Sequence, residues 1–332
     1  MVVGSGIATS LGFAAESTYG TYVAPSKFVQ FNSEDMKKVR AYIQGGGLAS
    51  GLMAKLGARR VFPTEAAAGT VTMEVTNKGL GVLFAHLMGS STAPVQQTST
   101  AAYLQTHAFG DNAGKSLTVQ EAVADTTGTN RVQTFKGGKI LSAEFSCTAD
   151  AVLTSAFEFD FMRYSEVETL AAPSYAAATP FHFGQMNVKL GNYGSEASVS
   201  GVKGVTCKIE RPHAVDRYYA GAAIPGTKAE PLMNGDAAVT GTIDIDFVNK
   251  ADFVDRFHGD TSTSVVLEWV GPIIASTFAQ TFRIRLPMVF FTGDTPAVDS
   301  EDIIGISVPF EAQLDGTNPL ATIEYMTTDI TL

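Results

Sequence analysis

The chain has 332 residues, of which 45% are hydrophobic and only 17% are charged. This composition excludes an intrinsically disordered chain and supplies enough apolar side chains for a large core, in two domains or in one large β domain. Lys and Arg total 23 against 33 Asp and Glu, and the resulting formal charge of −10 disfavours a protein that grips DNA phosphates.

No targeting or cross-linking feature stands out in the sequence. The longest uninterrupted apolar stretch, residues 79–89, is shorter than the ~20 residues of a membrane span, and the first residues lack the basic region of a secretory signal. We therefore expect no contact with a membrane and a protein that is made and kept in the cytoplasm. Cys147 and Cys207 are too few for a disulfide framework and lack zinc-site spacing, so we expect two buried free thiols.

The N-terminal segment, residues 1–27, is rich in Gly, Ala, Ser and Tyr. It combines backbone freedom with apolar residues that a free monomer would gain little by ordering, whereas a neighbouring subunit can bury them. We predict an N-terminal assembly arm.

The predicted first domain, residues 28–170, contains a long loop at about residues 44–68, although hairpin loops usually have about 2–5 residues. Its glycines and interspersed apolar side chains predict a loop that packs on another copy of the chain. These residues are Gly45, Gly46, Gly47, Leu48, Leu52, Met53 and Leu56.

A strand and a helix follow this loop, and both recur later in the chain. Residues 69–78 alternate apolar and polar side chains after a Gly-Thr pair, and residues 241–250 repeat the pattern 172 positions later. In each copy an Asn is placed to cap a short helix, and a Gly, Gly89 or Gly259, to end it in the left-handed conformation. Each helix has an apolar stripe, so we expect it to lie on a sheet.

The repeat continues with further strands. Residues 139–145 match residues 302–308, and another strand follows each. We therefore predict a tandem duplication, with a linker at residues 171–182 and a second domain at residues 183–332. Because runs of strands are interrupted by single helices, the prediction is a mainly β chain of two tandem antiparallel β-sandwich or half-barrel domains, each with one flanking helix and one long loop.

Carboxylates alternate with apolar residues along several of the predicted strands. In residues 156–161 three phenylalanines point to one side and two acids to the other. Acids two positions apart on a strand share one exposed face, so a solvated or pore-lining surface explains them better than catalysis does. The candidates are Glu74, Glu158, Asp160, Asp244 and Asp246.

Motifs that would indicate an enzyme fail on spacing. Residues 110–116 imitate a phosphate-binding loop but have three residues between the glycines where that motif needs four. The five histidines lack the spacing of a zinc protease, and no Ser lies in a Gly-x-Ser-x-Gly elbow. We predict no catalytic, cofactor or metal site and no enzymatic activity.

Taken together, several segments resemble the major tail protein, or tail tube protein, of bacteriophages with long non-contractile tails. The resemblance spans nearly the whole chain and is carried by loose patterns in the opening segment 6–21, in residues 69–89, 115–120 and 135–142, and in residues 239–247. One difference is that simple members of that family have a single tube domain and form rings of six subunits.

The resemblance implies a subunit of the virion tail, assembled in the host cytoplasm into stacked rings around a tape measure protein. It also implies contacts with the tail terminator and distal tail proteins, and phage DNA in transit that is not bound specifically. If each predicted domain fills one position, three chains close a pseudo-sixfold ring, whereas six chains are needed if the second domain is peripheral. The bore is then acidic, and the loop at residues 44–68 stacks the rings.

The main alternative is a two-domain β-sandwich binding module, such as an adhesin or a carbohydrate-binding protein. Clustered exposed aromatic side chains would favour it. The single Trp, Trp269, instead lies in a predicted strand at residues 264–270, and the tyrosines are dispersed.

Overall fold

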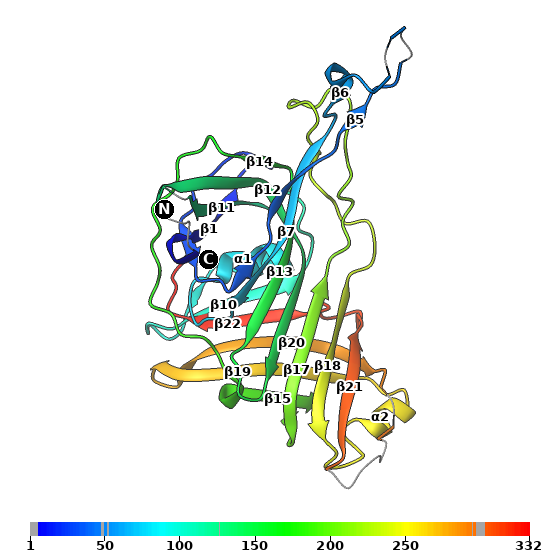
Figure 1. The fold of residues 1–332 in the computed structure, drawn as a ribbon. Coiled ribbons are helices and arrows are strands. Elements are labelled where there is room, and N and C mark those ends of the chain that lie inside the picture. Colours follow the sequence, from blue (N-terminus) through cyan, green and yellow to red (C-terminus); the bar gives the residue numbers. More distant parts are fainter. Residues whose placement is uncertain (1–5, 48–49, 52, 126, 294, 297–302) are drawn as a thin grey trace.

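A computed structural model describes residues 6–47, 50–51, 53–125, 127–293, 295–296 and 303–332. Within them the protein is mainly β, and its strand ladders are antiparallel, as the alternation predicts (Figure 1). The helical elements are the α-helices α1 and α2 and three single 3₁₀ turns: α1 (Gly81–Met88), α2 (Val254–His258), η1 (Gly6–Ala8), η2 (Gly57–Arg59) and η3 (Phe183–Gln185).

One sheet, here called the long sheet, runs through both halves of the chain (Figure 1). Each half contributes four strand positions in the same order, and the two sets meet where β12 pairs with β17. The order is β4 (Lys37–Arg40), β7 (Glu65–Glu74), β13 (Thr154–Phe161) and β12 (Asn130–Thr148), then β17 (Val202–Glu210), β18 (Ala238–Asp246), β21 (Gly305–Ala312) and the end of β20 (Phe278–Phe291). A two-residue strand, β3 (Ser33–Glu34), precedes β4 along the same edge.

The register shows which positions of the two halves correspond. Gly69 in β7 faces Phe159, and Gly241 in β18 faces Phe310. Both glycines leave room for a neighbouring strand, because a Cβ on Gly69 would lie 2.4 Å from the Cα of Met36 and one on Gly241 would lie 2.1 Å from the carbonyl oxygen of Thr206. This close approach explains why the repeated pattern begins with Gly.

Two further sheets cover the long sheet and complete a sandwich in each half. The long strands β12 and β20 take part in both layers of their own half, because their first parts pair within the covering sheet. The first covering sheet is β2 (Lys27–Val29), β1 (Ser10–Glu16), β11 (Ser116–Ala124), β12 and β14 (Arg163–Ser165). The second is β16 (Ala197–Ser198), β15 (Met186–Gly191), β19 (Thr263–Ala275), β20 and β22 (Thr322–Thr327), extended by β10 (Tyr103–Phe109), β8 (Gly89–Ser91) and β9 (Val95–Gln96).

The structure corrects three details of the sequence-based prediction. The segment predicted as an arm, residues 1–27, contains β1, whose Leu11 and Phe13 are fully buried between β2 and β11. The match of residues 139–145 to 302–308 is wrong. Residues 139–145 belong to β12, whereas the described residues of the second segment lead into β21, which pairs with β18 as β13 pairs with β7. Residue 302 lies outside the described part.

The third correction concerns the helix ends. The side chain of Asn77 accepts a hydrogen bond from the backbone N–H of Thr179 (2.9 Å) instead of capping α1, and Leu80 and Phe253 occupy the N-cap positions without a side-chain cap. Gly89 ends α1 at φ +86° as predicted, but Gly259 follows α2 in a right-handed conformation.

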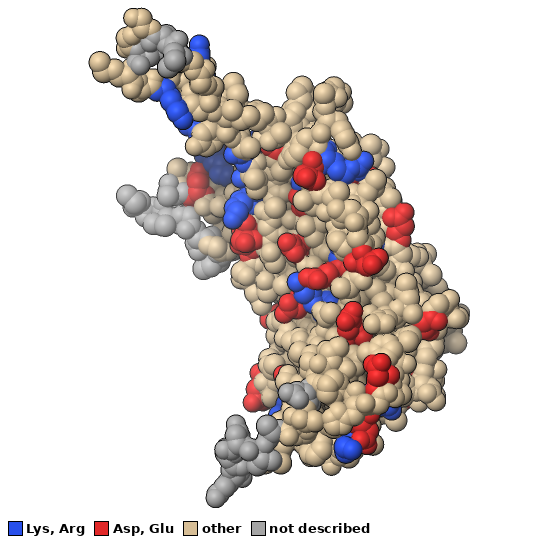
Figure 2. All heavy atoms as spheres, turned by 90° about the vertical axis from the view of Figure 1, so that its right-hand side faces the viewer, with Lys and Arg blue, Asp and Glu red and all other residues tan. Residues whose placement is uncertain are grey.

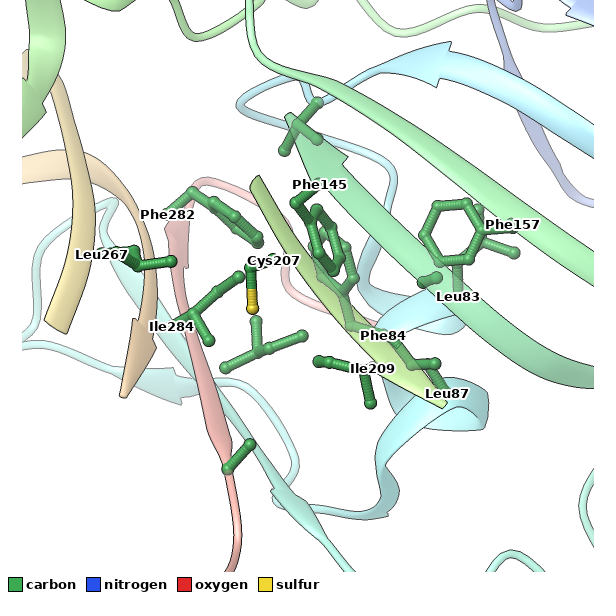
Figure 3. Close-up of a cluster of buried hydrophobic side chains, with 14 of the residues drawn as sticks. Leu83, Phe84, Leu87, Phe145, Phe157, Cys207, Ile209, Leu267, Phe282 and Ile284 are labelled. Carbon is green, nitrogen blue, oxygen red and sulfur yellow. The ribbon is translucent and has the colours of Figure 1, made fainter. Parts of the chain in front are cut away.

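The two halves share one hydrophobic core. α1 is buried on almost all sides, and Phe84 lies 5.3 Å from the ring of Phe282 in β20 and 6.3 Å from that of Phe145 in β12 (Figure 3). Cys207 in β17 points into the same cluster, so the thiol is buried as expected. Apolar burial of this kind contributes ~25 cal/mol per Å², and here it holds strands of both halves to one helix.

A buried arginine reinforces the junction of the halves. Arg211, directly after β17, is only 1% exposed, and its guanidinium donates to the carbonyl oxygens of Leu87 (2.8 Å) and Met88 (3.0 Å) at the end of α1. The ring of Phe109 lies 4.3 Å below it. Burial lowers the pKa of Arg211 to about 10, and the negative end of the helix dipole offsets this desolvation.

We expect Arg211→Ala to lower the free energy of unfolding by about 3 kcal/mol, because it leaves the carbonyls of α1 unsatisfied and opens a cavity. Urea denaturation measures the change. Lys208→Ala is the matched control on the same strand: Lys208 pairs with Glu210 at the surface, and its loss should cost about 0.5 kcal/mol or less. Equal effects of the two variants would contradict this role for Arg211.

Candidate assembly surfaces

The face of the long sheet turned away from the core is polar and acidic. Four of the predicted acids, from both halves, lie on this one face, because their neighbours in each strand are buried. Three further acids on this face were not predicted, although the alternation in β12, β17 and β21 indicates them. The complete set is Glu74, Glu144, Glu158, Glu210, Asp244, Asp246 and Glu311.

Few cations balance this face. Lys203 pairs with Asp246 and Lys208 with Glu210, and Lys37 lies on the same face at its edge. The outer face of the second covering sheet differs, because its acids alternate with cations across neighbouring strands. There Glu268 pairs with Lys189 (2.5 Å) and Arg283, and Glu324 pairs with Arg283 (2.5 Å) and Arg285 (2.8 Å). Uncompensated acid thus distinguishes the open face of the long sheet from the outer face of the second covering sheet.

Asp160 does not belong to the exposed acids, and its assignment as a lumen-facing residue is wrong. It is 5% exposed and forms an ion pair with Lys228. Lys139, its cross-strand neighbour, pairs in turn with Glu230 at 2.5 Å. Both partners come from the long loop at residues 211–237, which therefore covers the upper end of the first half instead of standing free.

The predicted assembly loop is a projecting hairpin, here called the arm (residues 36–64). Its stem pairs β5 (Ile43–Gln44) with β6 (Arg60–Val61), and it extends well beyond the body (Figure 1). Met53 and Leu56 are exposed, as are four apolar or aromatic residues of the stem, Tyr42, Ile43, Val61 and Phe62. Gly45 lies by the stem and Gly46 and Gly47 are exposed, whereas Leu48 and Leu52 lie outside the described residues.

The arm is strongly basic, a property that was not predicted although the sequence contains it. Residues 36–64 contain six cations and no acid: Lys37, Lys38, Arg40, Lys55, Arg59 and Arg60. The arginines stack on exposed rings, Arg40 at 3.9 Å from the centroid of Phe62 and Arg60 at 4.0 Å from that of Tyr42. Among the charged residues on the side drawn in Figure 2, the arm shows Lys and Arg, while Asp and Glu prevail over the body.

The long sheet ends in two incompletely paired edges. At one edge β3 and β4 pair only with β7, and every residue of β4 is exposed. At the other edge only the last residues of β21 pair with β20, from Phe310 onward. Unpaired backbone N–H and C=O groups of this kind are templates for pairing with another chain.

The sequence matches the family of phage tail tube proteins over residues 6–312. The chain belongs to the phage tail tube protein family. It is therefore a structural component of the virion tail, of a family whose members assemble into the tail tube. A search of curated proteins found no match.

Two negative findings concern the described part of this tail tube protein. No three His, Cys, Asp or Glu side chains there are grouped as metal ligands would be. Neither of its described helices has the length and apolar character to cross a bilayer.

A pair of carboxyl groups lies beneath the exposed edge of the tube protein. Glu121 in β11 is 4% exposed, and burial together with the neighbouring carboxyl of Glu34 in β3 raises the pKa of Glu121 to about 8. Glu34 also accepts a hydrogen bond from the backbone N–H of Met36 (2.6 Å). The shared proton links β3 to the covering sheet, so ionisation of Glu121 weakens that link.

This pair predicts a pH dependence of stability. The folded-state pKa of Glu121 lies above its unfolded value near 4.5. The protonated carboxyl therefore contributes its full stabilisation of the fold below pH 4.5, and this stabilisation is lost as the pH rises towards about 8. We expect Glu121→Gln to remove part of the loss of stability between pH 5 and pH 8. Urea denaturation midpoints at the two pH values measure this loss of stability. Glu166→Gln, at an exposed acid, is the control. An unchanged slope in Glu121→Gln would contradict the assignment.

Proposed function

We propose that three chains close into one ring of the tail tube and that each half of the chain fills one of six equivalent positions. What supports this is the four-strand order that each half repeats within the long sheet. Three copies would supply six such units, and the pairing of β12 with β17 would already provide every second junction. A ring of six chains would need the second half to be peripheral, although it continues the same sheet.

In this ring the acidic face of the long sheet lines the bore. Closing the sheet satisfies the open edges and leaves only one face inside, and the long sheet spans both halves. A negative lining repels phosphate along its whole length, so DNA in transit is not held, whereas a basic lining would bind it nonspecifically. The bore encloses the tape measure protein during assembly in the host cytoplasm, and the tube ends meet the tail terminator and distal tail proteins.

The arm carries the contact between stacked rings. Its apolar side chains, Ile43, Met53 and Leu56 among them, are exposed in the single chain, and its six cations complement a protein whose net charge is −10. Burial of Tyr42, Ile43 and Phe62 against a neighbouring ring would supply apolar area, while the cations orient the approach.

Electron microscopy of the purified protein tests the tube and the arm together. We expect long hollow tubes from the wild type. Replacing residues 46–58 by Asn-Gly keeps the hydrogen bond from the backbone N–H of Gly45 to Arg59 (2.9 Å) as the closing pair of a two-residue hairpin, and this variant should fold normally but yield single rings or free subunits. Tubes of normal length from the shortened variant would refute stacking by the arm, and monodisperse wild-type particles would refute the tube.

Charge reversal tests the acidic bore. Glu158→Lys with Asp244→Lys should leave tube assembly intact but make reconstituted tubes bind short duplex DNA at low salt, with release as salt rises, because lysine–phosphate contacts exchange counterions. In phage the same change should slow genome ejection. The control, Glu166→Lys with Asp216→Lys, adds the same charge outside the sheet. Equal DNA retention by both double variants would contradict the orientation of the long sheet.

A further inference from the structure

We propose that Arg40 of one chain binds the C-terminal end of α2 in the next chain, and so repeats between subunits the contact that Arg211 makes inside the chain. The proposal rests on the ring described above and names the residues that close it. Its partner is a second copy of this chain.

Arg40 and Arg211 hold the same position in the two halves. Lys37 faces Ala68 of β7, and Lys208 faces Thr240 of β18. Ala68 and Thr240 are one residue before the corresponding glycines, Gly69 and Gly241, so Lys37 corresponds to Lys208. Each arginine follows its lysine by three residues, at the point where the first long-sheet strand of its half ends and the long loop of that half begins.

The two helix ends correspond as well. Gly89 follows the last residue of α1, and Gly259 follows the last residue of α2. The end of α1 is buried under Arg211, whereas His258 and Gly259 at the end of α2 are exposed. Carbonyls at a helix C-terminus attract cations, and the carboxylates of Asp255 and Asp260 lie beside this exposed end in sequence.

In the described part of the single chain, the guanidinium of Arg40 has few contacts. Its side chain is exposed, and its described contact is the stack on Phe62 in the basic arm. Arg211, by contrast, gains three carbonyl acceptors from the first half. The same residue type at the same position thus has carbonyl acceptors where a preceding half supplies them, and lacks them where the described chain has no preceding half.

The internal junction also gives the register of the junction between chains. Ser142 of β12 faces Glu210 of β17, and the backbone N–H of Arg211 donates to the carbonyl of Leu141 (2.7 Å). Ser142 and Glu210 are therefore a non-hydrogen-bonded pair, in which side chains approach most closely. By correspondence Val39 takes the place of Glu210.

Thr292 takes the place of Ser142. Its backbone N–H donates to the carbonyl of Pro309 (2.9 Å), and Pro309 corresponds in β21 to Glu158, the residue that faces Ser142. The proposed ladder thus places Val39 of one chain opposite Thr292 of the next, with Arg40 directed at the end of α2.

Removing the guanidinium tests the contact. Arg40→Ala should raise the critical protein concentration for tube formation by about tenfold or more, because hydrogen bonds to a charged group are lost at each closure. Arg40→Lys should recover part of the effect, since it keeps the charge but not the planar fork. The thermal midpoint of the monomer should not change. Arg131→Ala, at another exposed arginine outside the long-sheet edges, is the control and should assemble normally.

Disulfide trapping tests the register. Oxidised tubes of Val39→Cys with Thr292→Cys should give covalent dimers and trimers, and no larger species, on a non-reducing gel. Lys27→Cys with Thr292→Cys, which keeps one cysteine and moves the other to β2, should remain monomeric.

The outcomes separate the two proposals. Tubes that form at the wild-type concentration in Arg40→Ala and do not cross-link through residues 39 and 292 would overturn the Arg40 contact and leave the tube intact. Ladders that continue beyond trimers would contradict the ring of three while supporting the Arg40 junction. Wild-type protein that forms no tube or ring would refute the proposed function itself.

Discussion

The pairing of β12 with β17 is the constraint on which the rest of the architecture depends. It joins the halves into one sheet, so that strands far apart in sequence present their acids on one face and their apolar side chains to one core. Because α1 and Phe282 fill the space behind this junction, and Arg211 caps α1 from the other half, the halves cannot separate without exposing the centre of the core. In the ring that we propose, this junction is an internal copy of the interface between chains.

The charged residues are distributed differently over the arm, the long sheet and the second covering sheet. A protein with a net charge of −10 keeps its arm free of acids and leaves the long-sheet acids largely unpaired, yet it balances Glu268 and Glu324 with arginines on the second covering sheet. Where two charged strands lie side by side, cross-strand pairing is the lower-energy arrangement. The long sheet forgoes it on its open face, which is consistent with a surface selected for repulsion of a polyanion.

Local periodicity was sufficient to predict the strand class, the buried phenylalanines of β13, the end of α1 at Gly89 and the shared face of Glu74, Glu158, Asp244 and Asp246. It failed where a distant segment decides the outcome. Asp160 has the alternation of an exposed acid, but Lys228 from the second half covers it. Asn77 has the spacing of a helix cap, but its side chain accepts a hydrogen bond from the backbone of Thr179 instead. The segment of β1 becomes a strand because β11 and β2 pair with it. The place of residues 305–312 beside β18 is likewise decided by strand pairing, which the sequence pattern alone does not show. The basic arm was visible in the sequence and required only a count of charges.

The difference between β17 and its counterpart at the edge follows from what flanks each of them. β17 is a continuous strand of nine residues with β12 on one side and β18 on the other. The corresponding segment of the first half is divided into β3 and β4, two and four residues long, with β7 on one side only. Both segments run along equivalent strands, so intrinsic register does not account for the contrast. Covalent linkage holds β12 beside β17 at a high effective concentration, whereas in the proposed ring the partner of β4 comes from another chain. The shorter, exposed edge is therefore the expected state of a strand whose second neighbour arrives only on assembly.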